Sequence, residues 1–349
     1  MTRGVAQPVL EIRDLAVAFR GGAPVVDGVS LSIHAGQTLA IVGESGSGKS
    51  VTALSALRLL PPGGQIRRGH ILLRDGERAI DIACAGDRDL RRIRGGQVAM
   101  VFQEPMTSLN PVLPIGEQVA EAARLHQGVR GRAARDAAVR ALEEVGVADA
   151  ASRFGDYPHE FSGGMRQRVV IAIALACRPR VLLADEPTTA LDAHLRMQIL
   201  DLLDDARARR SMAVALITHD LGLVAERADA LCVMDAGRVV EYGARDAVLH
   251  SPLHPYTRAL LACAPRIDEA RARLVTVRET LDAPGAFDPV PTGAGARTPW
   301  WPGGACRDGE TCRLVDAGAE RWLAVWAGAE VPFVVPDVSA ARDEREAAA

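Results

Sequence analysis

Apolar and polar residues alternate along the first part of the chain and then give way to short, uninterrupted apolar runs. The alternation over Leu10–Phe19 and 25–33 predicts two half-buried strands joined by a Gly-Gly-Ala-Pro turn. Thr38–Val42 is a continuous apolar stretch, which is typical of a strand buried on both faces. From Val51 onward apolar residues recur at three-residue spacing, which predicts a helix that ends before Pro61.

Between residues 97 and 250 the chain alternates apolar strands with helical segments. Further strands are predicted at 97–102, 180–184, 213–218, 230–234 and 238–242. Residues 105–177 carry helical periodicity. This alternation indicates an α/β fold, in which a parallel sheet is connected by crossover helices.

The character of the sequence changes beyond about residue 250. One more helix is expected at 254–262, and residues 284–304 are dominated by Pro, Gly, Ala and Thr. The last nine residues, 341–349, read as a flexible tail. We therefore expect the C-terminal quarter to be an extension that is distinct from the α/β part.

Composition narrows the class of protein. At 349 residues with 48% hydrophobic residues, the chain is long enough for a core domain and an appendage. A net charge of −3 argues against a protein that works by coating nucleic acid, so no nucleic-acid partner is expected. No stretch approaches the roughly 18 apolar residues of a membrane-spanning helix, and the N-terminus lacks a secretory signal, so we expect a cytosolic chain.

The segment GESGSGKS, residues 43–50, contains the only lysine in the chain, Lys49. Arginine replaces lysine elsewhere, but a forked guanidinium does not fit a ring of backbone amides as a compact ammonium does. Strand, glycine-rich loop and helix follow in the order of a phosphate-binding loop. In such a loop the backbone N–H groups bind phosphate oxygens, the lysine reaches the β- and γ-phosphates and the Ser50 hydroxyl ligates Mg²⁺. The residues expected to bind the nucleotide here are Gly43, Ser45, Gly46, Gly48, Lys49, Ser50 and Val51.

A second candidate element is VLLADEPTTALD, residues 181–192, an apolar strand that ends in Asp185 and Glu186. The carboxyl edge of a parallel sheet is where ligands bind in α/β proteins. We expect Asp185 to hold Mg²⁺ and Glu186 to orient and deprotonate the attacking water. By itself this pattern is equally compatible with a strand end that precedes a helix cap.

A third element is Ser162, followed by Gly163 and Gly164 at the start of a helical run. A hydroxyl and exposed amides at a helix start favour an anion, although Ser with glycines is also ordinary capping chemistry.

With these motifs in this order, residues 9–250 resemble the ATP-binding cassette (ABC) ATPases. Segment 101–105 matches the family's Q-loop, 162–167 its signature motif, 190–192 its D-loop and 217–220 its switch histidine. Phe161 and Met165 are mild departures from the usual signature. The resemblance implies a P-loop NTPase nucleotide-binding domain, with a parallel-sheet core, an antiparallel β subdomain and a helical subdomain at about 105–177.

The resemblance also implies roles for single residues. Gln103 would sense Mg²⁺ and the attacking water, His219 would contact the γ-phosphate, and Asp192 would communicate across a head-to-tail dimer. Ser162, Gly163 and Gly164 would cover the ATP bound to the partner's phosphate loop. Phe19 lies where the family places an aromatic ring against adenine, although a core phenylalanine fits that position as well.

Two further segments, 96–112 and 254–261, resemble the ATP-binding subunits of oligopeptide, dipeptide and nickel importers. That family carries a C-terminal extension after the cassette, here 251–349. Its members pair with a related ATPase or with themselves, with two membrane permeases and indirectly with an extracytoplasmic solute-binding protein. The resemblance implies an ATPase at the cytoplasmic face of the inner membrane, with peptides as the first expected solute and nickel or another small solute as the second.

Some members carry an iron–sulfur cluster in the extension. Beyond residue 263 this chain has only Cys306 and Cys312, two thiolates short of a cysteine-only cluster, so no cluster is expected. Two other classes remain open: a non-transport ABC ATPase acting in DNA repair or translation, and an accessory ATP-binding protein that rarely turns over.

Overall fold

The computed structural model describes residues 7–76, 78–103, 108–189, 191–264, 276–283, 285–292, 295–302, 311–318 and 321–327. The chain divides into two compact units, one of residues 1–83 with 217–349 and one of residues 84–216. The tail predicted at 341–349 lies outside the described residues.

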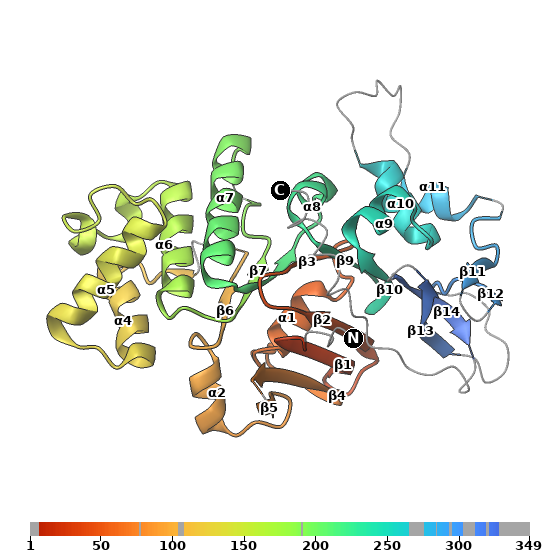
Figure 1. The fold of residues 1–349 in the computed structure, drawn as a ribbon, viewed down its shortest axis with the longest axis horizontal. Helices are drawn as coiled ribbons and strands as arrows, with labels where there is room; N and C mark the ends of the chain where they lie inside the picture. The colour runs from red at the N-terminus through yellow and green to blue at the C-terminus, as the bar shows by residue number, and fades with distance from the viewer. Residues whose placement is uncertain are drawn as a thin grey trace, which may run out of the picture. The chain divides into compact units, whose positions relative to one another are not determined.

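An antiparallel sheet begins the first unit (Figure 1). Its strands lie in the order β2-β1-β4-β5 and span Pro24–Ile33, Leu10–Phe19, Gly64–Asp75 and Arg78–Asp81. Leu10 pairs with Ile33 of β2 on one side and with Leu73 of β4 on the other. The predicted strands β1 and β2 are confirmed, but their burial does not alternate strictly. Leu15 and Leu31 are buried, and so are the polar residues Ser30 and Ser32 on either side of Leu31.

A second group of strands in the same unit contains the predicted parallel pair. The order is β13-β14-β10-β9-β3, with bounds Thr311–Gly318, Arg321–Ala327, Arg238–Ala244, Ala230–Asp235 and Thr38–Val42. Strands β3 and β9 run parallel, and Leu39 pairs with Ala230. All five residues of β3 are buried, as its continuous apolar run predicts.

The helices of the first unit are short. They are α1 (Lys49–Ser55), α8 (Leu221–Arg227), α9 (Arg245–His250), α10 (Pro255–Cys263) and α11 (Val277–Leu281). A small hairpin of β11 (Val290–Thr292) and β12 (Gly295–Arg297) completes the unit. The predicted helix at 254–262 is confirmed as α10.

Residues on both sides of position 250 share one sheet and one core. Tyr242 of β10 pairs with Trp322 of β14. One hydrophobic cluster joins cassette positions with later ones; it includes Val42, Val224, Val240, Val248, Tyr256, Trp300 and Ala324. The strands β13 and β14 were not anticipated. They pair with each other, and β14 pairs with β10, which lies far away in the sequence, so composition alone does not show this arrangement. The division into domains at residue 250 stays a prediction.

The second unit holds the acidic strand and the helical segment. Its strands lie in the order β8-β7-β6 and span Ala213–Ile217, Val181–Asp185 and Val98–Val101. The last residue of β8, Ile217, belongs to the first unit. Its α-helices are α2 (Asp87–Ile93), α4 (Ile115–Gln127), α5 (Gly131–Glu144), α6 (Gly163–Ala176) and α7 (Ala193–Arg210), and its 3₁₀ turns are η1 (Arg153–Gly155) and η2 (Pro158–Glu160). Strands β6 and β7 are parallel, as predicted.

The helical segment expected at 105–177 is present as α4, α5 and α6, which pack on one another (Figure 1). Their shared core includes Val119, Leu142 and Phe154. Gly116 lets Phe154 approach closely, since a Cβ atom at position 116 would lie 2.3 Å from the phenyl ring. Residues 104–107, at the start of the predicted segment, lie outside the described ranges.

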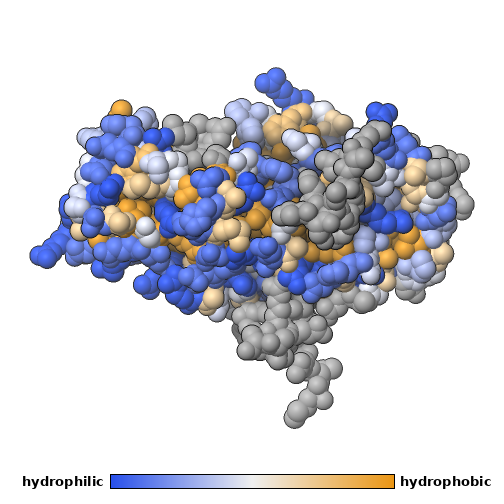
Figure 2. All heavy atoms as spheres, turned by 90° about the horizontal axis from the view of Figure 1, so that it is seen from above, coloured by the Kyte–Doolittle hydropathy of each residue, from blue (hydrophilic) through white to orange (hydrophobic). Residues whose placement is uncertain are grey.

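In the part of the chain that the structure describes, no helix has the length and apolar character needed to cross a membrane. The face shown in Figure 2 mixes hydrophilic and hydrophobic residues. Val112 and Leu125, which are 75% and 72% exposed, are the most exposed large apolar residues described. Single exposed apolar side chains of this kind are ordinary on protein surfaces.

The shared core predicts that a chain ending at residue 250 is much less stable than the parent. Such a chain loses Tyr256, Trp300 and Ala324 from the cluster and leaves one edge of β10 without its partner β14. We expect its melting temperature to fall by about 10 °C or more, because removal of several core side chains costs several kcal/mol. A chain ending at residue 327 is the matched control. Equal melting temperatures for the two truncated chains would show that 251–327 is an independent domain.

Candidate nucleotide-binding site

The loop at 43–50 connects β3 to α1 and depends on its glycines. Gly43, Gly46 and Gly48 have φ angles of 152°, 85° and 97°, which L side chains rarely adopt. A Cβ atom at Gly43 would lie 2.1 Å from the Met234 carbonyl oxygen. The loop therefore packs tightly against the end of β9, and only glycine fits at its first position.

Lys49 lies inside this loop. Its Nζ atom donates to the carbonyl oxygens of Gly43 at 2.7 Å and Glu44 at 2.8 Å, and to Ser47 Oγ at 3.3 Å. The lysine is only 7% exposed. An ammonium group has three donors in a compact arrangement, which matches these three acceptors. The geometry explains why this position holds lysine in a chain that otherwise uses arginine.

The other residues predicted to bind the nucleotide occupy different environments. Ser45 and Gly46 are exposed at the tip of the loop, and Ser50 and Val51 are half-buried at the start of α1. Phe19 is half-buried at the end of β1, and a Cβ atom at position 64 would lie 2.8 Å from its ring. Nothing here tests the adenine contact of Phe19, which stays a prediction.

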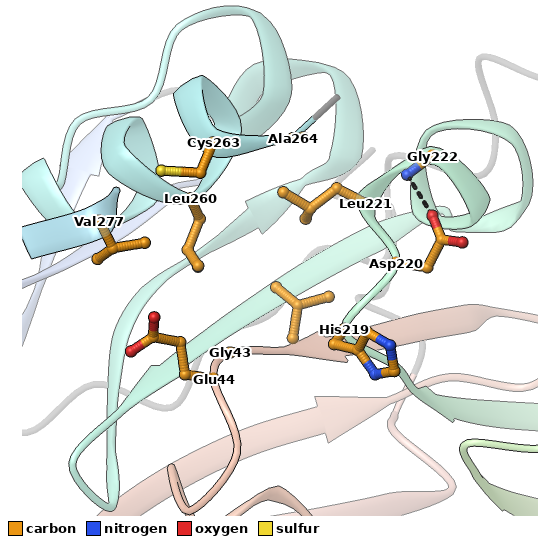
Figure 3. Close-up of a pocket in the computed structure, with 11 residues that line it drawn as sticks. Gly43, Glu44, His219, Asp220, Leu221, Gly222, Leu260, Cys263, Ala264 and Val277 are labelled. Carbon is orange, nitrogen blue, oxygen red and sulfur yellow. Dashed lines mark hydrogen bonds between the residues drawn. The ribbon is translucent and has the colours of Figure 1, made fainter. Parts of the chain in front are cut away.

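His219 lies near the start of the phosphate loop. It is exposed directly after β8, and the next residue, Asp220, caps α8 by accepting the N–H groups of Gly222 at 3.0 Å and Leu223 at 3.3 Å. His219, Gly43 and Glu44 line one wall of a cavity of about 570 Å³ (Figure 3). The structure thus brings the predicted switch histidine to the same cavity as the first residues of the phosphate loop.

The opposite wall of this cavity comes from the C-terminal helices. Leu260 and Cys263 of α10 and Val277 of α11 face Glu44 and His219 across it (Figure 3). That these residues lie near the loop was not predicted from the sequence. For Leu260 and Cys263, the spacing of apolar positions on α10 indicates a buried face but does not show what covers it.

In the second unit, Gln103 and Glu186 lie together. Gln103 Nε2 donates to Glu186 Oε2 at 2.9 Å, and Thr189 Oγ1 donates to the same oxygen at 2.8 Å. Glu186 has a φ angle of 47°, a left-handed conformation that costs a non-glycine residue about 1–2 kcal/mol. Asp185, at the end of β7, is 6% exposed. The carboxylate predicted as the catalytic base is therefore held in one orientation by two donors, of which Thr189 was not anticipated.

Ser162 and Asp192 cap two helices of the same unit. Ser162 Oγ accepts the Met165 N–H at 3.4 Å at the start of α6, and Asp192 Oδ1 accepts the Leu195 N–H at 2.9 Å at the start of α7. Both capping residues, and Gly163, are exposed. Gly164 is buried, and a Cβ atom there would lie 3.0 Å from the Leu195 side chain. The signature segment and the D-loop helix are thus neighbours.

A half-buried carboxyl group, Asp235, lies near the phosphate loop. Burial raises the pKa of Asp235 to about 6, and the neighbouring Glu44 carboxylate adds to the rise, while the Ala236 N–H group opposes it. Asp235 ends β9 as Asp185 ends β7. That parallel was visible in the sequence, but the sequence does not show that Asp235 lies beside Glu44.

Among the described residues, no group of three or more His, Cys, Asp or Glu side chains could hold a metal ion. Cys312 is half-buried, and burial raises the pKa of its thiol to about 11. Cys306 lies outside the described residues.

The phosphate loop, the parallel strands and the acidic strand end define the chain as a P-loop ATPase of the ABC type. The family model described as ABC transporter matches residues 26–189, and the model described as oligopeptide/dipeptide transporter, C-terminal region, matches residues 240–293. A dimeric ATP-binding cassette solved in a post-hydrolysis state with ADP and Pi superposes with a TM-score of 0.59. The two sequences are 26% identical. The match covers 68% of this chain and 98% of that cassette.

Two similar proteins are both ATP-binding proteins of import systems. A peptide import ATP-binding protein of Brucella melitensis is 50% identical over 269 residues, which are 76% of this chain and 80% of the relative. A glutathione import ATP-binding protein of Salmonella typhimurium is 47% identical over 291 residues, or 81% of this chain. The chain spans about half of that second relative, 47% of its length.

The chain belongs to the ATP-binding subunits of ABC transporters of the oligopeptide/dipeptide family. The family and the fold class predicted from the motifs are confirmed.

The raised pKa of Asp235 predicts a specific pH dependence of stability. The pKa of about 6 means that the folded carboxyl keeps its proton up to about pH 6, whereas in the unfolded chain it has the ordinary aspartate pKa of 3.8. Its contribution to stability is therefore greatest at low pH and is lost as the pH rises from about 4 through 6. Asp235→Asn, which cannot ionise, avoids this loss.

We expect the melting temperature of Asp235→Asn, relative to the parent, to increase by a few degrees between pH 4.5 and 7. Thermal unfolding of both chains across this range measures the difference. Asp205→Asn on the exposed side of α7 controls for the loss of a carboxylate. A difference that is constant with pH would contradict the assignment.

Proposed function

We propose that this chain hydrolyses Mg-ATP and couples the reaction to uptake of di- and oligopeptides through partner permeases. The observation that carries the ATPase assignment is the loop closed around Lys49, whose ammonium is available to exchange carbonyl oxygens for phosphate oxygens. The peptide assignment is supported by the match of residues 240–293 to the transporter C-terminal region and by the identity to a peptide import protein.

In the proposed reaction, the backbone N–H groups of Ser45, Gly46 and Gly48 bind phosphate oxygens, and Lys49 balances the charge of the β- and γ-phosphates. Glu186 accepts a proton from the attacking water as it approaches the γ-phosphorus. Its hydrogen bonds from Gln103 and Thr189 fix the carboxylate orientation in advance, so little reorganisation is needed at the moment of reaction.

His219 would contact the γ-phosphate, a role supported by its position on the cavity wall beside Gly43. The Ser50 hydroxyl, the Asp185 carboxylate and the amide oxygen of Gln103 would hold Mg²⁺, since hard cations prefer oxygen ligands. Gln103 donates through Nε2 to Glu186, which leaves its amide oxygen for a cation. When bound, Mg²⁺ would neutralise charge that develops on the phosphate oxygens.

We further propose that two cassettes act as a head-to-tail dimer, with this chain or with a paralogous subunit. Ser162 and Gly163 are exposed at the start of α6, so their hydroxyl and amide groups are accessible to a nucleotide held by a second cassette. Asp192 is exposed at the start of α7 and can meet the same partner. The similar cassette solved as a dimer with ADP and Pi supports this arrangement.

The remaining partners follow from the family. We propose two transmembrane permeases, an extracytoplasmic solute-binding protein that acts indirectly, and a peripheral location at the cytoplasmic face of the inner membrane. Glutathione is a second candidate solute because of the Salmonella relative, and it is itself a tripeptide. Nickel remains a less favoured alternative. The matched transporter C-terminal region speaks against a role in DNA repair or translation.

Glu186→Gln tests the catalytic base. The amide keeps the size of the side chain but cannot take up the proton, so we expect ATP hydrolysis to fall by about 100-fold or more while ATP still binds. Equilibrium binding of ATP and phosphate release by the same preparation measure the two effects. Glu226→Gln, on the exposed side of α8, is the matched control. Parental turnover by Glu186→Gln would remove Glu186 from the mechanism.

Reconstitution with the proposed partner permeases and solute-binding protein tests which solute is transported. We expect di- and oligopeptides to stimulate ATP turnover severalfold, because solute loading is coupled to closure of the cassettes. Glutathione and Ni²⁺ are added in parallel. Stimulation by Ni²⁺ alone would show that the transported solute is nickel. Co-purification of the chain with DNA or ribosomes would contradict a role in import.

A further inference from the structure

A hydrogen bond connects the phosphate loop to a residue beyond the cassette. The backbone N–H of Glu44, the second residue of the loop, donates to the hydroxyl oxygen of Tyr256 at 3.0 Å. Tyr256 lies in the first turn of α10 and is 2% exposed. The residues of this helix described so far, Leu260 and Cys263, line the cavity beside the loop, whereas Tyr256 is hydrogen-bonded to the loop itself.

The same residue, Glu44, is held from two sides. Its carbonyl oxygen accepts a hydrogen bond from Lys49 Nζ at 2.8 Å, and its N–H group donates to the Tyr256 hydroxyl oxygen at 3.0 Å. In the proposed function, Lys49 must turn toward phosphate when ATP binds. When that happens, the carbonyl bond weakens and the bond to Tyr256 is left to hold the Glu44 peptide in place.

The backbone of Tyr256 is itself fixed by a series of hydrogen bonds that begins in β10. The carboxylate of Glu241, which is 0% exposed, accepts the N–H groups of Leu253 at 2.9 Å and His254 at 3.0 Å. His254 Nδ1 then accepts the N–H of Tyr256 at 3.1 Å, and its Nε2 lies 2.7 Å from the Trp300 carbonyl oxygen.

These partners define the state of His254. The Trp300 carbonyl only accepts and the Tyr256 N–H only donates, so Nε2 carries the proton and the lone pair of Nδ1 accepts the Tyr256 N–H. Burial lowers the pKa of His254 to about 4, partly offset by the Trp300 carbonyl, so the ring is neutral near pH 7. The start of α10 is therefore anchored to the sheet at a defined place, and Tyr256 with it.

We propose that Tyr256 is a positioning residue of the nucleotide site: its hydroxyl holds the Glu44 peptide so that the phosphate loop keeps its shape while Lys49 exchanges carbonyl oxygens for phosphate. The proposal rests on the proposed ATPase function. It gives the C-terminal segment a direct part in nucleotide affinity, through a single side chain, in addition to its share of the core.

The test compares two tyrosine hydroxyls in the same unit. Tyr256→Phe removes the acceptor for Glu44 and keeps the ring. Tyr242→Phe removes the hydroxyl that donates to the Ser32 carbonyl oxygen at 2.9 Å, in an equally buried position on β10. Both variants lose one buried hydrogen bond, so any general loss of stability should be similar in the two.

Binding of a fluorescent ATP analogue to the full-length chain is measured at equilibrium. We expect the dissociation constant to rise about three- to tenfold in Tyr256→Phe, the change that corresponds to loss of one buried hydrogen bond, and by less than about twofold in Tyr242→Phe. In the reconstituted transporter the KM for ATP should rise by a similar factor with kcat within about twofold, because Tyr256 does not touch the reacting atoms.

Amide hydrogen exchange measures the Glu44–Tyr256 contact directly in the absence of nucleotide. The parent chain alone already tests the contact, even if a variant does not fold. The Glu44 N–H should exchange slowly in the parent and in Tyr242→Phe, and faster in Tyr256→Phe. Rapid exchange of Glu44 in the parent, or equal ATP affinity of the two variants, would overturn the role of Tyr256. A parent that shows a protected Glu44 amide but binds no ATP would instead overturn the proposed function.

Discussion

The ammonium of Lys49 is enclosed by the carbonyl oxygens of its own loop, and the rest of the nucleotide site depends on that arrangement. The loop can close only because Gly43, Gly46 and Gly48 adopt angles that other residues avoid, and because the first of them packs against the end of β9. A cation buried in this way is satisfied by oxygen atoms, so phosphate oxygens can take their place without leaving a bare charge.

In the second unit, hydrogen bonds likewise hold the Glu186 carboxylate in one orientation. Glu186 adopts a left-handed backbone conformation and receives two hydrogen bonds on one oxygen, from Gln103 and Thr189. Strain of this kind is retained where the surrounding contacts compensate for it and where the side chain must point in one direction. The exposed starts of α6 and α7, with Ser162 and Asp192 as caps, leave polar groups accessible for a second cassette.

The segment after residue 250 is bound to the cassette by more than a covalent connection. Strand β14 pairs with β10, Trp300 and Ala324 enter a core that begins with Val42, and Tyr256 contacts the phosphate loop itself. Under the role proposed for Tyr256, a change in α10 would alter the phosphate loop through the Glu44–Tyr256 hydrogen bond. The segment is thus both a structural partner of the sheet and a candidate route for regulation.

The sequence by itself determined the class of this protein, because phosphate chemistry requires Gly43, Lys49, Asp185 and Glu186 in a local order that needs no tertiary information. It also predicted β1, β3 and the helical segment, whose periodicity is local. It could not show that Thr189 orients Glu186, that the half-buried Asp235 lies beside Glu44, or that Tyr256 reaches the loop from 212 residues away. Burial and long-range hydrogen bonds arise only when distant segments pack together, so the tertiary structure alone decided them.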